Sequence, residues 1–290
     1  MTVTTMARRL VLLWLAGAAG TVAAPSAGAA DRPVGEKPNI VILFADDLGY
    51  GDLGGYGHPY IRTPNLDALG RQGQRWTDFY MAAPVCSPSR GALLTGKLPN
   101  RTGLYGRQIG VFFPNAEAGI PPEERTLAEA LAERGYTAAI IGKWHLGDGP
   151  DALPTRHGFD YWYGLPYSND MDWADGRNFD ELMAMRLAGR GDELQQVIGA
   201  RRQLYRNPKV EYWNVPLMRS RKTGTDVNEE VIERPTQQTT LTKRYTEEAI
   251  AFIEQSRDRP FFLYLPYSMP HTPIFRSETF AGRSLGGRYG

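Results

Sequence analysis

Cysteine and net charge are both scarce in this 290-residue sequence. A single cysteine, Cys86, rules out an intrachain disulfide, so the packing of the core must stabilise the fold. The formal net charge of +1 offers no general attraction to nucleic acid or to an acidic membrane, and neither is expected as a partner. The apolar run Leu10–Val22 is too short for a comfortable membrane span, so no stable membrane association is expected. The length suffices for one large α/β domain or two small ones.

The first 30 residues have the organisation of a signal peptide. Arg8 and Arg9 precede the apolar run, and small residues around Ala27 and Ala29 offer a cleavage site. The sequence therefore predicts a signal peptide over residues 1–30 and a folded domain over residues 31–290. A periplasmic or secreted location in a bacterium is expected, with an uncleaved N-terminal anchor as the alternative.

The single cysteine lies where a helix is expected to begin. Ser87 is a candidate N-cap, Pro88 suits the first helical position, and Gly96 suits a left-handed stop after the helix. Backbone N–H groups and the helix dipole would favour negative charge at Cys86, with Arg90 one turn further on. The alternative is a small, inert, buried side chain.

Two adjacent carboxylates follow the first apolar run of the domain. Asn39–Ala45 is typical of a parallel strand buried on both faces, and Asp46 and Asp47 follow it directly, before a glycine-rich loop. Adjacent carboxylates repel each other and favour a bound cation, and a site built only from oxygen ligands favours Ca²⁺ or Mg²⁺. Turn or cap duty is the alternative for the pair.

Polar residues also follow two later buried strands. The predicted strand Thr137–Ile141 leads to Lys143 and His145, and Phe261–Leu265 leads to a loop that contains His271. Taken alone, Lys143 could be a solvated amine and His145 a hydrogen-bonded residue near the core. Ligands of open α/β sheets bind at the carboxyl ends of strands, so we expect these groups to meet at one sheet edge.

The other predicted elements are helices and loops. The segment Phe159–Asp170 is expected to be an aromatic loop that covers the sheet edge, and Met171–Gln238 is the least readable part. Its basic residues could bind an anionic ligand or could be solvated loop charges: Arg201, Arg202, Arg206, Arg219, Arg221 and Lys222. Helices are predicted at 64–72, 86–95, 127–134, 179–187, 192–205 and 242–255.

Five segments together resemble the type I, formylglycine-dependent sulfatase family, in its arylsulfatase A-like branch. They are the strand ending in Asp46-Asp47, Cys-Ser-Pro-Ser-Arg at 86–90 with Leu-Thr-Gly at 94–96, Gly-Lys-Trp-His at 142–145, Gly-Leu-Pro-Tyr-Ser at 164–168, and Pro-His-Thr-Pro at 270–273. The resemblance runs from about Lys37 to Gly290. One position departs from the pattern, because Ala138 stands where Ser or Thr is usual.

The resemblance implies an alkaline-phosphatase-like α/β fold, with a mostly parallel sheet sandwiched by helices. It implies hydrolysis of aryl or carbohydrate sulfate monoesters by a formylglycine derived from Cys86, after maturation by a formylglycine-generating enzyme, with bound Ca²⁺ rather than Mg²⁺. Carried over by position, the catalytic residues are Cys86, Arg90, Lys143, His145 and His271, the substrate-binding residues are Lys143, Ser168 and His271, and the metal ligands are Asp46, Asp47 and Cys86.

Some parts of the family pattern have no counterpart in the sequence. They are an Asp-Asn pair that completes the calcium shell, a second lysine for sulfate, and a smaller C-terminal domain. We therefore expect residues 31–290 to be the N-terminal portion of a truncated catalytic domain. Two other functions stay open: hydrolysis of phosphate or phosphonate monoesters on the same fold, and binding of sulfated glycans without catalysis.

Overall fold

The fold is built on one six-stranded sheet. It is seen in a computed structural model that describes residues 37–105, 110–116 and 119–290, so the signal peptide predicted over residues 1–30 lies outside the described residues. The strands are ordered β1-β6-β2-β3-β4-β5. Their bounds are Ile40–Phe44 for β1, Thr137–Ile141 for β2, Tyr161–Gly164 for β3, Leu217–Thr223 for β4, Asp226–Glu233 for β5 and Phe261–Pro266 for β6.

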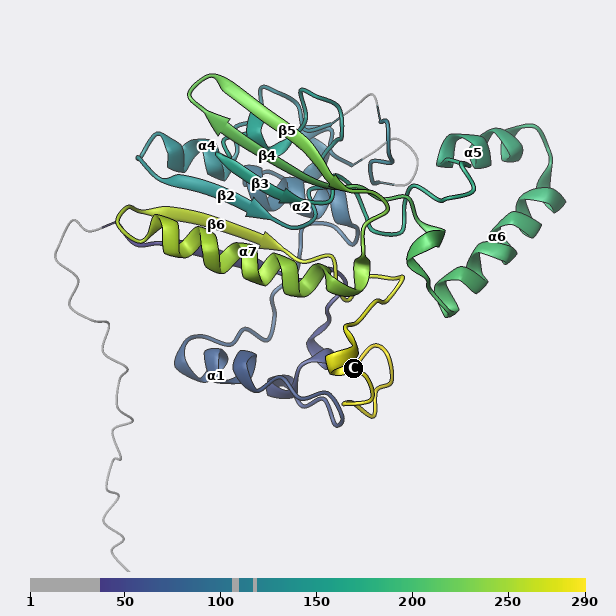
Figure 1. Ribbon diagram of the computed structural model, residues 1–290, viewed down its shortest axis with the longest axis horizontal. Coiled ribbons are helices and arrows are strands. Elements are labelled where there is room, and N and C mark those ends of the chain that lie inside the picture. The colour runs from purple at the N-terminus through teal and green to yellow at the C-terminus, as the bar shows by residue number, and fades with distance from the viewer. Residues whose placement is uncertain (1–36, 106–109, 117–118) are drawn as a thin grey trace, which may run out of the picture. The chain divides into compact units, whose positions relative to one another are not determined.

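Strands β1, β6, β2 and β3 are parallel, so their carboxyl ends meet at one edge of the sheet (Figure 1). The central strands are apolar throughout, and every residue of β6 is buried, as expected for strands covered on both faces. Strands β4 and β5 form an antiparallel hairpin that extends the sheet beside β3. The sheet is thus mixed, with the parallel half carrying the expected candidate residues.

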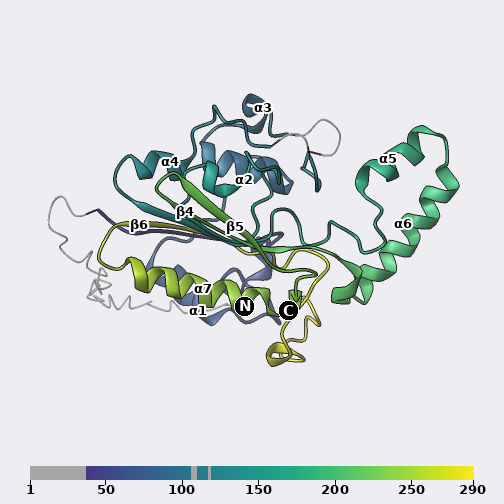
Figure 2. The same cartoon turned by 45° about the horizontal axis from the view of Figure 1, so that its top comes forward.

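Helices cover both faces of the sheet and create two separate cores. On one face, α7 (Leu241–Ser256) packs through Tyr245 and Phe252 against alternate residues of the strands. On the other face, α2 (Cys86–Thr95) and α4 (Leu127–Ala132) pack through Leu94 and Ala128 against the intervening residues, such as Trp162 (Figure 2). The predicted sandwich of a mostly parallel sheet between helices is confirmed.

The remaining helices lie at the margins. Helices α5 (Phe179–Leu187) and α6 (Gly191–Arg206) pack on each other beyond the carboxyl ends of the parallel strands (Figure 1). Two further helices are α1 (Pro64–Gln72) and the single turn α3 (Pro99–Thr102). The six predicted helices all form, with bounds that differ by one or two residues. No helix within the described ranges is both long and apolar enough to cross a bilayer.

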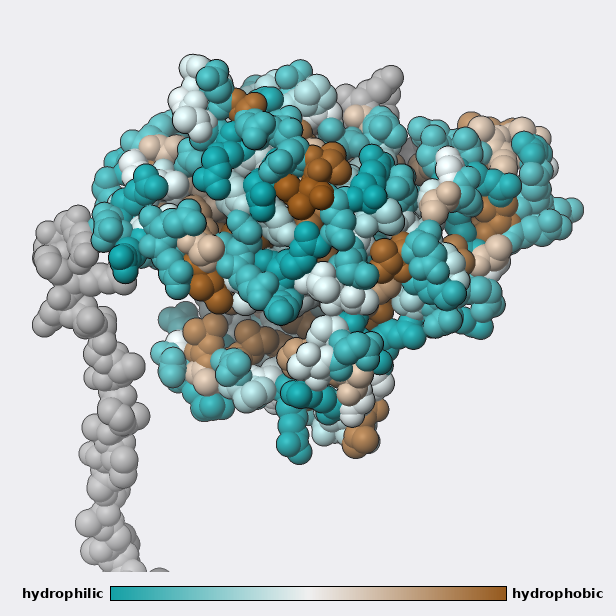
Figure 3. Space-filling view, viewed as in Figure 1, coloured by the Kyte–Doolittle hydropathy of each residue, from teal (hydrophilic) through white to brown (hydrophobic). Residues whose placement is uncertain are grey.

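Strand β1 is not buried on both faces, contrary to the sequence prediction. It is the outermost strand in the described part of the chain, and Val41 and Leu43 are 45% and 52% exposed. Apolar side chains also reach the surface on α1 and α7, and Figure 3 shows apolar surface beside hydrophilic surface on this side of the molecule. These exposed residues are Leu66, Leu69, Ile250 and Ile253. An apolar run therefore identified the strand but not its neighbours.

The segment Phe159–Asp170 is likewise not an edge-covering loop. It contains β3, whose Tyr161, Trp162 and Tyr163 pair with β2 on one side and β4 on the other. Aromatic residues are enriched in strands, so the composition was compatible with either structure. The hairpin β4–β5 was missed because its residues are largely polar and half of the hairpin is exposed.

Candidate active site

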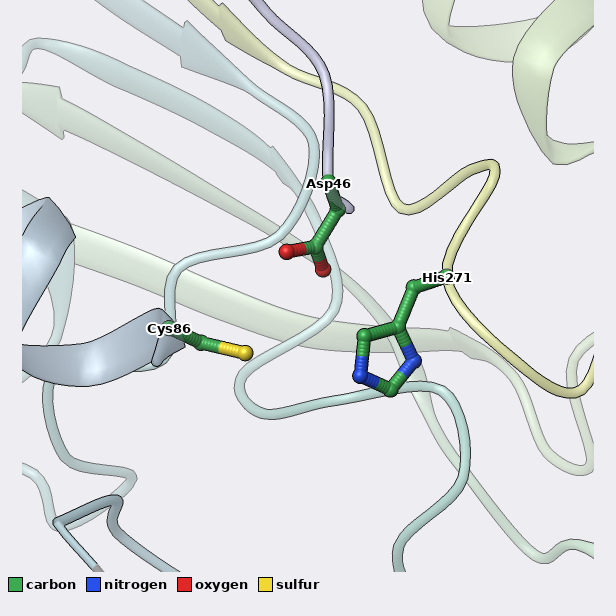
Figure 4. A group of neighbouring side chains, drawn as sticks. All are labelled: Asp46, Cys86 and His271. Atoms are coloured by element: carbon green, nitrogen blue, oxygen red, sulfur yellow. The ribbon is translucent and has the colours of Figure 1, made fainter. Parts of the chain in front are cut away.

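Residues from three distant segments meet beyond the carboxyl ends of β1 and β6. Asp46 follows β1, Cys86 begins α2, and His271 lies in the loop after β6 (Figure 4). One oxygen of Asp46, the Cys86 sulfur and one ring nitrogen of His271 all lie within 4.8 Å of one another. The sequence separation of these residues shows that the fold, not local structure, assembles the cluster.

Lys143 links the cluster to the residues that follow β2 and β3. Its side chain is fully buried, and its Nζ lies 2.6 Å from Asp46 Oδ2, 2.9 Å from Ser168 Oγ and 3.3 Å from Cys86 Sγ. Lys143 follows β2, and Ser168 follows β3. Residues that follow β1, β2 and β3 therefore meet at this ammonium group, and His271 after β6 joins them through the cluster with Asp46 and Cys86.

Arg90 supplies a second buried cation. Its guanidinium lies 3.4 Å from Asp46 Oδ1, donates to the Lys143 carbonyl at 2.8 Å, and stacks over the ring of Phe44 at 5.4 Å. Burial alone would raise the pKa of Asp46, but the charges of Lys143 and Arg90 hold that pKa well below its usual range. The site thus contains one buried carboxylate and two buried cations. Its net positive charge would favour a bound anion.

Cys86 is the first residue of α2, but the predicted cap is different. The N-cap is Val85, in extended conformation, and Ser87 Oγ instead accepts a hydrogen bond from the Phe112 amide at 3.1 Å. Pro88 occupies the third helical position, where its missing N–H costs no helical hydrogen bond. Gly96 ends the helix in the predicted left-handed conformation, with φ of 67°. The positive end of α2 therefore points at the cysteine side chain.

The thiol and His271 influence each other. Burial raises the pKa of Cys86, but a hydrogen bond with His271 and the charge of Lys143 outweigh it and lower that pKa. Burial lowers the pKa of His271, but the hydrogen bond with Cys86 raises it to about 9. The contact between them thus lowers the pKa of the thiol and raises that of the imidazole. Cys86 thus lies in an electropositive setting beside Lys143 and His271.

His145, two residues after Lys143, is also buried. Its Nε2 lies 2.8 Å from the Phe112 carbonyl, which can only accept, so this nitrogen carries the proton and Nδ1 has a free lone pair. Burial and the charges of Lys143 and Arg90 hold the pKa of His145 well below 6.5. The imidazole is therefore neutral and can serve as a proton acceptor. Sequence reasoning did not identify the Phe112 carbonyl, which has no side-chain signal.

Asp47 stands apart from the other predicted metal ligands. Its side chain is 61% exposed, its backbone has a φ of 62°, and its Oδ2 lies 3.6 Å from His271 Nε2. The tight cluster within the described residues therefore contains His271 rather than Asp47. The two carboxylates have the oxygen donors that Ca²⁺ prefers, but they are fewer than the six to eight oxygens of a full shell.

Two glycines allow the strand ends to approach closely enough to form the site. A Cβ atom on Gly142, which has a φ of 134°, would lie 1.9 Å from the Pro266 carbonyl oxygen. A Cβ atom on Gly164 would lie 1.7 Å from the Gly142 carbonyl oxygen. Beyond these contacts, the Lys143 amide donates to the Pro266 carbonyl at 2.8 Å. Glycine at both positions is what lets β2 carry Lys143 between the ends of β3 and β6.

The basic residues expected at the substrate entrance are partly committed elsewhere. Arg201 is buried over the ring of Trp173 at 3.6 Å and pairs with Asp175. Arg221 stacks on Tyr161, the first residue of β3, so it lies toward the opposite edge of the sheet from the site. Both residues are thus engaged by neighbouring side chains.

Comparison with known proteins identifies the family. The sulfatase family model matches residues 38–287. The chain belongs to the sulfatase family. Human arylsulfatase A is 41% identical over 266 residues, which are 90% of this chain and 47% of that protein. The N-acetylgalactosamine-6-sulfatase of the dog is 39% identical over 93% of this chain and 46% of its own length. Mouse steryl-sulfatase is 39% identical over 91% of this chain and 46% of its own length.

Solved structures share the fold. The PsFucS1 sulfatase from Pseudoalteromonas sp. superposes with a TM-score of 0.66 at 30% identity, covering 87% of this chain and 48% of its own. Ps i-CgsB in complex with k-i-k-neocarrahexaose gives a TM-score of 0.57 at 31% identity, covering 82% of this chain and 46% of its own. The predicted alkaline-phosphatase-like fold is confirmed. This sulfatase chain spans about half the length of the curated relatives it matches.

Proposed function

We propose that this chain carries the catalytic centre for hydrolysis of sulfate monoesters, with Cys86 converted to formylglycine. The observation that supports this most directly is the position of Cys86 at the start of a helix, 3.3 Å from Lys143 Nζ. A nucleophile there would meet a sulfate group at the one point where two buried cations and a helix N-terminus converge. Membership of the sulfatase family supports the same reaction class.

The electrostatic task is to bring an anionic ester against a nucleophile. Lys143 and Arg90 would neutralise the sulfate oxygens, and Ser168, which accepts a hydrogen bond from Lys143, would hold the ammonium toward them. Arg90 is locked by the Lys143 carbonyl, so its guanidinium needs no reorganisation when the substrate binds. Lys143 and Ser168 would bind the sulfate together, and His271 would contact it from the Asp46 and Cys86 side of the site.

Residue 86 supplies the covalent chemistry after maturation. A hydrated aldehyde there offers two hydroxyl groups, one to attack sulfur and one whose deprotonation expels the sulfate, which serine could not do. Oxidation of the thiol needs an external oxidant, so the proposal includes a formylglycine-generating enzyme as the maturation partner. The surrounding cations that lower the pKa of the thiol would favour anionic oxygen in its place.

The two histidines would have complementary roles in proton transfer. His271, with one ring nitrogen within 4.8 Å of the Cys86 sulfur, would donate a proton to the leaving alcohol. His145 is neutral, with its Nδ1 unprotonated, and would accept the proton released at residue 86. An acid and a base held in opposite states by their environments are the pattern expected of hydrolytic sites.

A calcium ion would be held by Asp46 and Asp47, with residue 86 as a further ligand. Asp46 is ionised and fits this role, although Lys143 and Arg90 already engage its two oxygens. An ion there would supply additional positive charge for the sulfate and for the nucleophile. The rest of the shell falls to ligands beyond these three residues. Export to the periplasm or medium is proposed from residues 1–30 of the sequence alone.

The proposal is tested with the chain after conversion of Cys86, on 4-nitrophenyl sulfate and 4-nitrophenyl phosphate in Ca²⁺. We expect hydrolysis of the sulfate ester in preference to the phosphate ester, and loss of turnover in Cys86→Ala. Preference for phosphate would replace the reaction by phosphomonoester hydrolysis. Binding of sulfated sugar with no turnover of either ester would indicate a non-catalytic glycan-binding protein.

A further inference from the structure

Two buried amide side chains bond to each other beside the candidate site. Asn169 Nδ2 donates to Gln238 Oε1 at 3.0 Å, and Gln238 Nε2 donates to the backbone carbonyl oxygen of Asn169 at 3.0 Å. Gln238 begins the short turn Gln238–Thr240 that leads into α7, far from Asn169 in sequence. The two bonds therefore tie the loop after β3 to the start of α7.

The same amide group reaches a third segment. The second N–H of Asn169 Nδ2 donates to the Pro273 carbonyl at 3.3 Å, in the loop that follows β6. Asn169 is adjacent to Ser168, and Pro273 is two residues after His271. The Asn169 amide thus bridges the two loops that carry the proposed substrate-binding serine and the proposed acid.

Burial makes this arrangement costly to rearrange. Asn169 is 0% exposed and Gln238 is 2% exposed, so water cannot replace the hydrogen bonds if they break. Reversing the Asn169 amide would place its oxygen against two acceptors, which fixes its orientation. Within the described residues its Oδ1 has no partner, so the amide is held in place by its donors alone. Gln238 supplies two of the three bonds to Asn169.

We infer that Gln238 and Asn169 are positioning residues whose paired amides fix the Ser168 loop against the His271 loop. The inference rests on the proposed function for its purpose, because neither side chain contacts the proposed reacting atoms. Its structural content is independent of turnover: removal of the Gln238 amide must loosen both loops together, while strand β6 keeps its packing.

The test compares Gln238→Met with Gln237→Met in the 290-residue chain. Methionine is close to glutamine in size, so the first variant removes the hydrogen bonds without a large cavity. Gln237 is an exposed neighbour that makes no bond to either loop, and its variant is the matched control. Hydrogen–deuterium exchange is read on peptides covering residues 165–172 and 267–275, with strand residues 261–265 as the reference.

We expect exchange about tenfold faster in both loop peptides of Gln238→Met, with the reference strand and the control variant unchanged. Unchanged loops, loosening of only one loop, or equal loosening of the strand would each overturn the inference. In the converted enzyme, kcat for nitrophenyl sulfate should fall about tenfold or more with a smaller change in KM. Absence of turnover in the parent chain would refute the proposed function, and exchange would still decide the inference.

Discussion

The close approach of β2 and β3 at the site makes Gly164→Ala the sharpest perturbation of this structure. The added Cβ would lie 1.7 Å from the Gly142 carbonyl oxygen, far inside van der Waals contact. Because the contact is with backbone, no side-chain rotation relieves it, and β3 must move away from β2 by about 1 Å or more. That movement strains the hydrogen bonds from Gly142 N to Tyr163 O and from Trp144 N to Leu165 O.

The cost follows from the two effects together. Overpacking a rigid interior costs about 1–3 kcal/mol. Weakening two backbone hydrogen bonds adds roughly 1 kcal/mol for each bond lost. We therefore expect Gly164→Ala to lower the free energy of unfolding by about 3–5 kcal/mol. Since the displacement lies next to Lys143, turnover by the converted chain should fall about a hundredfold, as a shift of about 1 Å does in other enzymes.

The assay is urea unfolding at equilibrium, followed by circular dichroism and tryptophan fluorescence. Gly199→Ala is the matched control, because Gly199 lies in α6 with nothing within 4 Å of the added atom. Alanine there should stabilise the chain by up to about 1 kcal/mol. A Gly164→Ala chain within 0.5 kcal/mol of the parent would refute the argument that glycine is required for the approach.

Three further perturbations address the charges of the site. Lys143→Met breaks a buried ion pair with Asp46, so urea unfolding should show a free energy of unfolding lower by about 3 kcal/mol. Lys243→Met breaks the exposed pair with Glu247 and should cost under about 1 kcal/mol. The pKa of His145 is depressed in the fold and near 6.5 when unfolded, so unfolded chains bind the extra proton and stability falls as pH drops below 6.5. The slope from this residue is up to about 1.4 kcal/mol per pH unit, and an equal slope in His145→Gln would contradict the assignment. Isothermal titration should detect Ca²⁺ binding that Asp47→Asn weakens at least tenfold, and equal affinity in that variant would remove Asp47 from the metal site.

The sequence was most informative where chemistry and strand ends coincide. Buried apolar runs ending in Asp46, Lys143 and His271 predicted that the three would meet at one sheet edge, and the structure places them there. The glycine stop at Gly96 was also confirmed, because it depends on the local backbone conformation. Features governed by neighbours in sequence were therefore readable without the fold.

Features governed by distant neighbours were not readable. An apolar run cannot tell an inner strand from an outer one, which is why β1 was expected to be covered on both faces. The N-cap role given to Ser87 was wrong because a tertiary partner, the Phe112 amide, competes for its hydroxyl group. The importance of Gly164 and Gln238 depends on contacts across the sheet and between loops, for which a single sequence holds no periodic or motif signal.

The central claim concerns the chemical identity of residue 86, and mass spectrometry of the peptide that contains it tests this claim most directly. The protein should be purified from its native host and digested, and the peptide spanning residue 86 compared with its sequence mass. The account predicts a mass lower by about 18 Da, the difference between a thiol and an aldehyde at that position. A peptide carrying an intact cysteine would contradict the account.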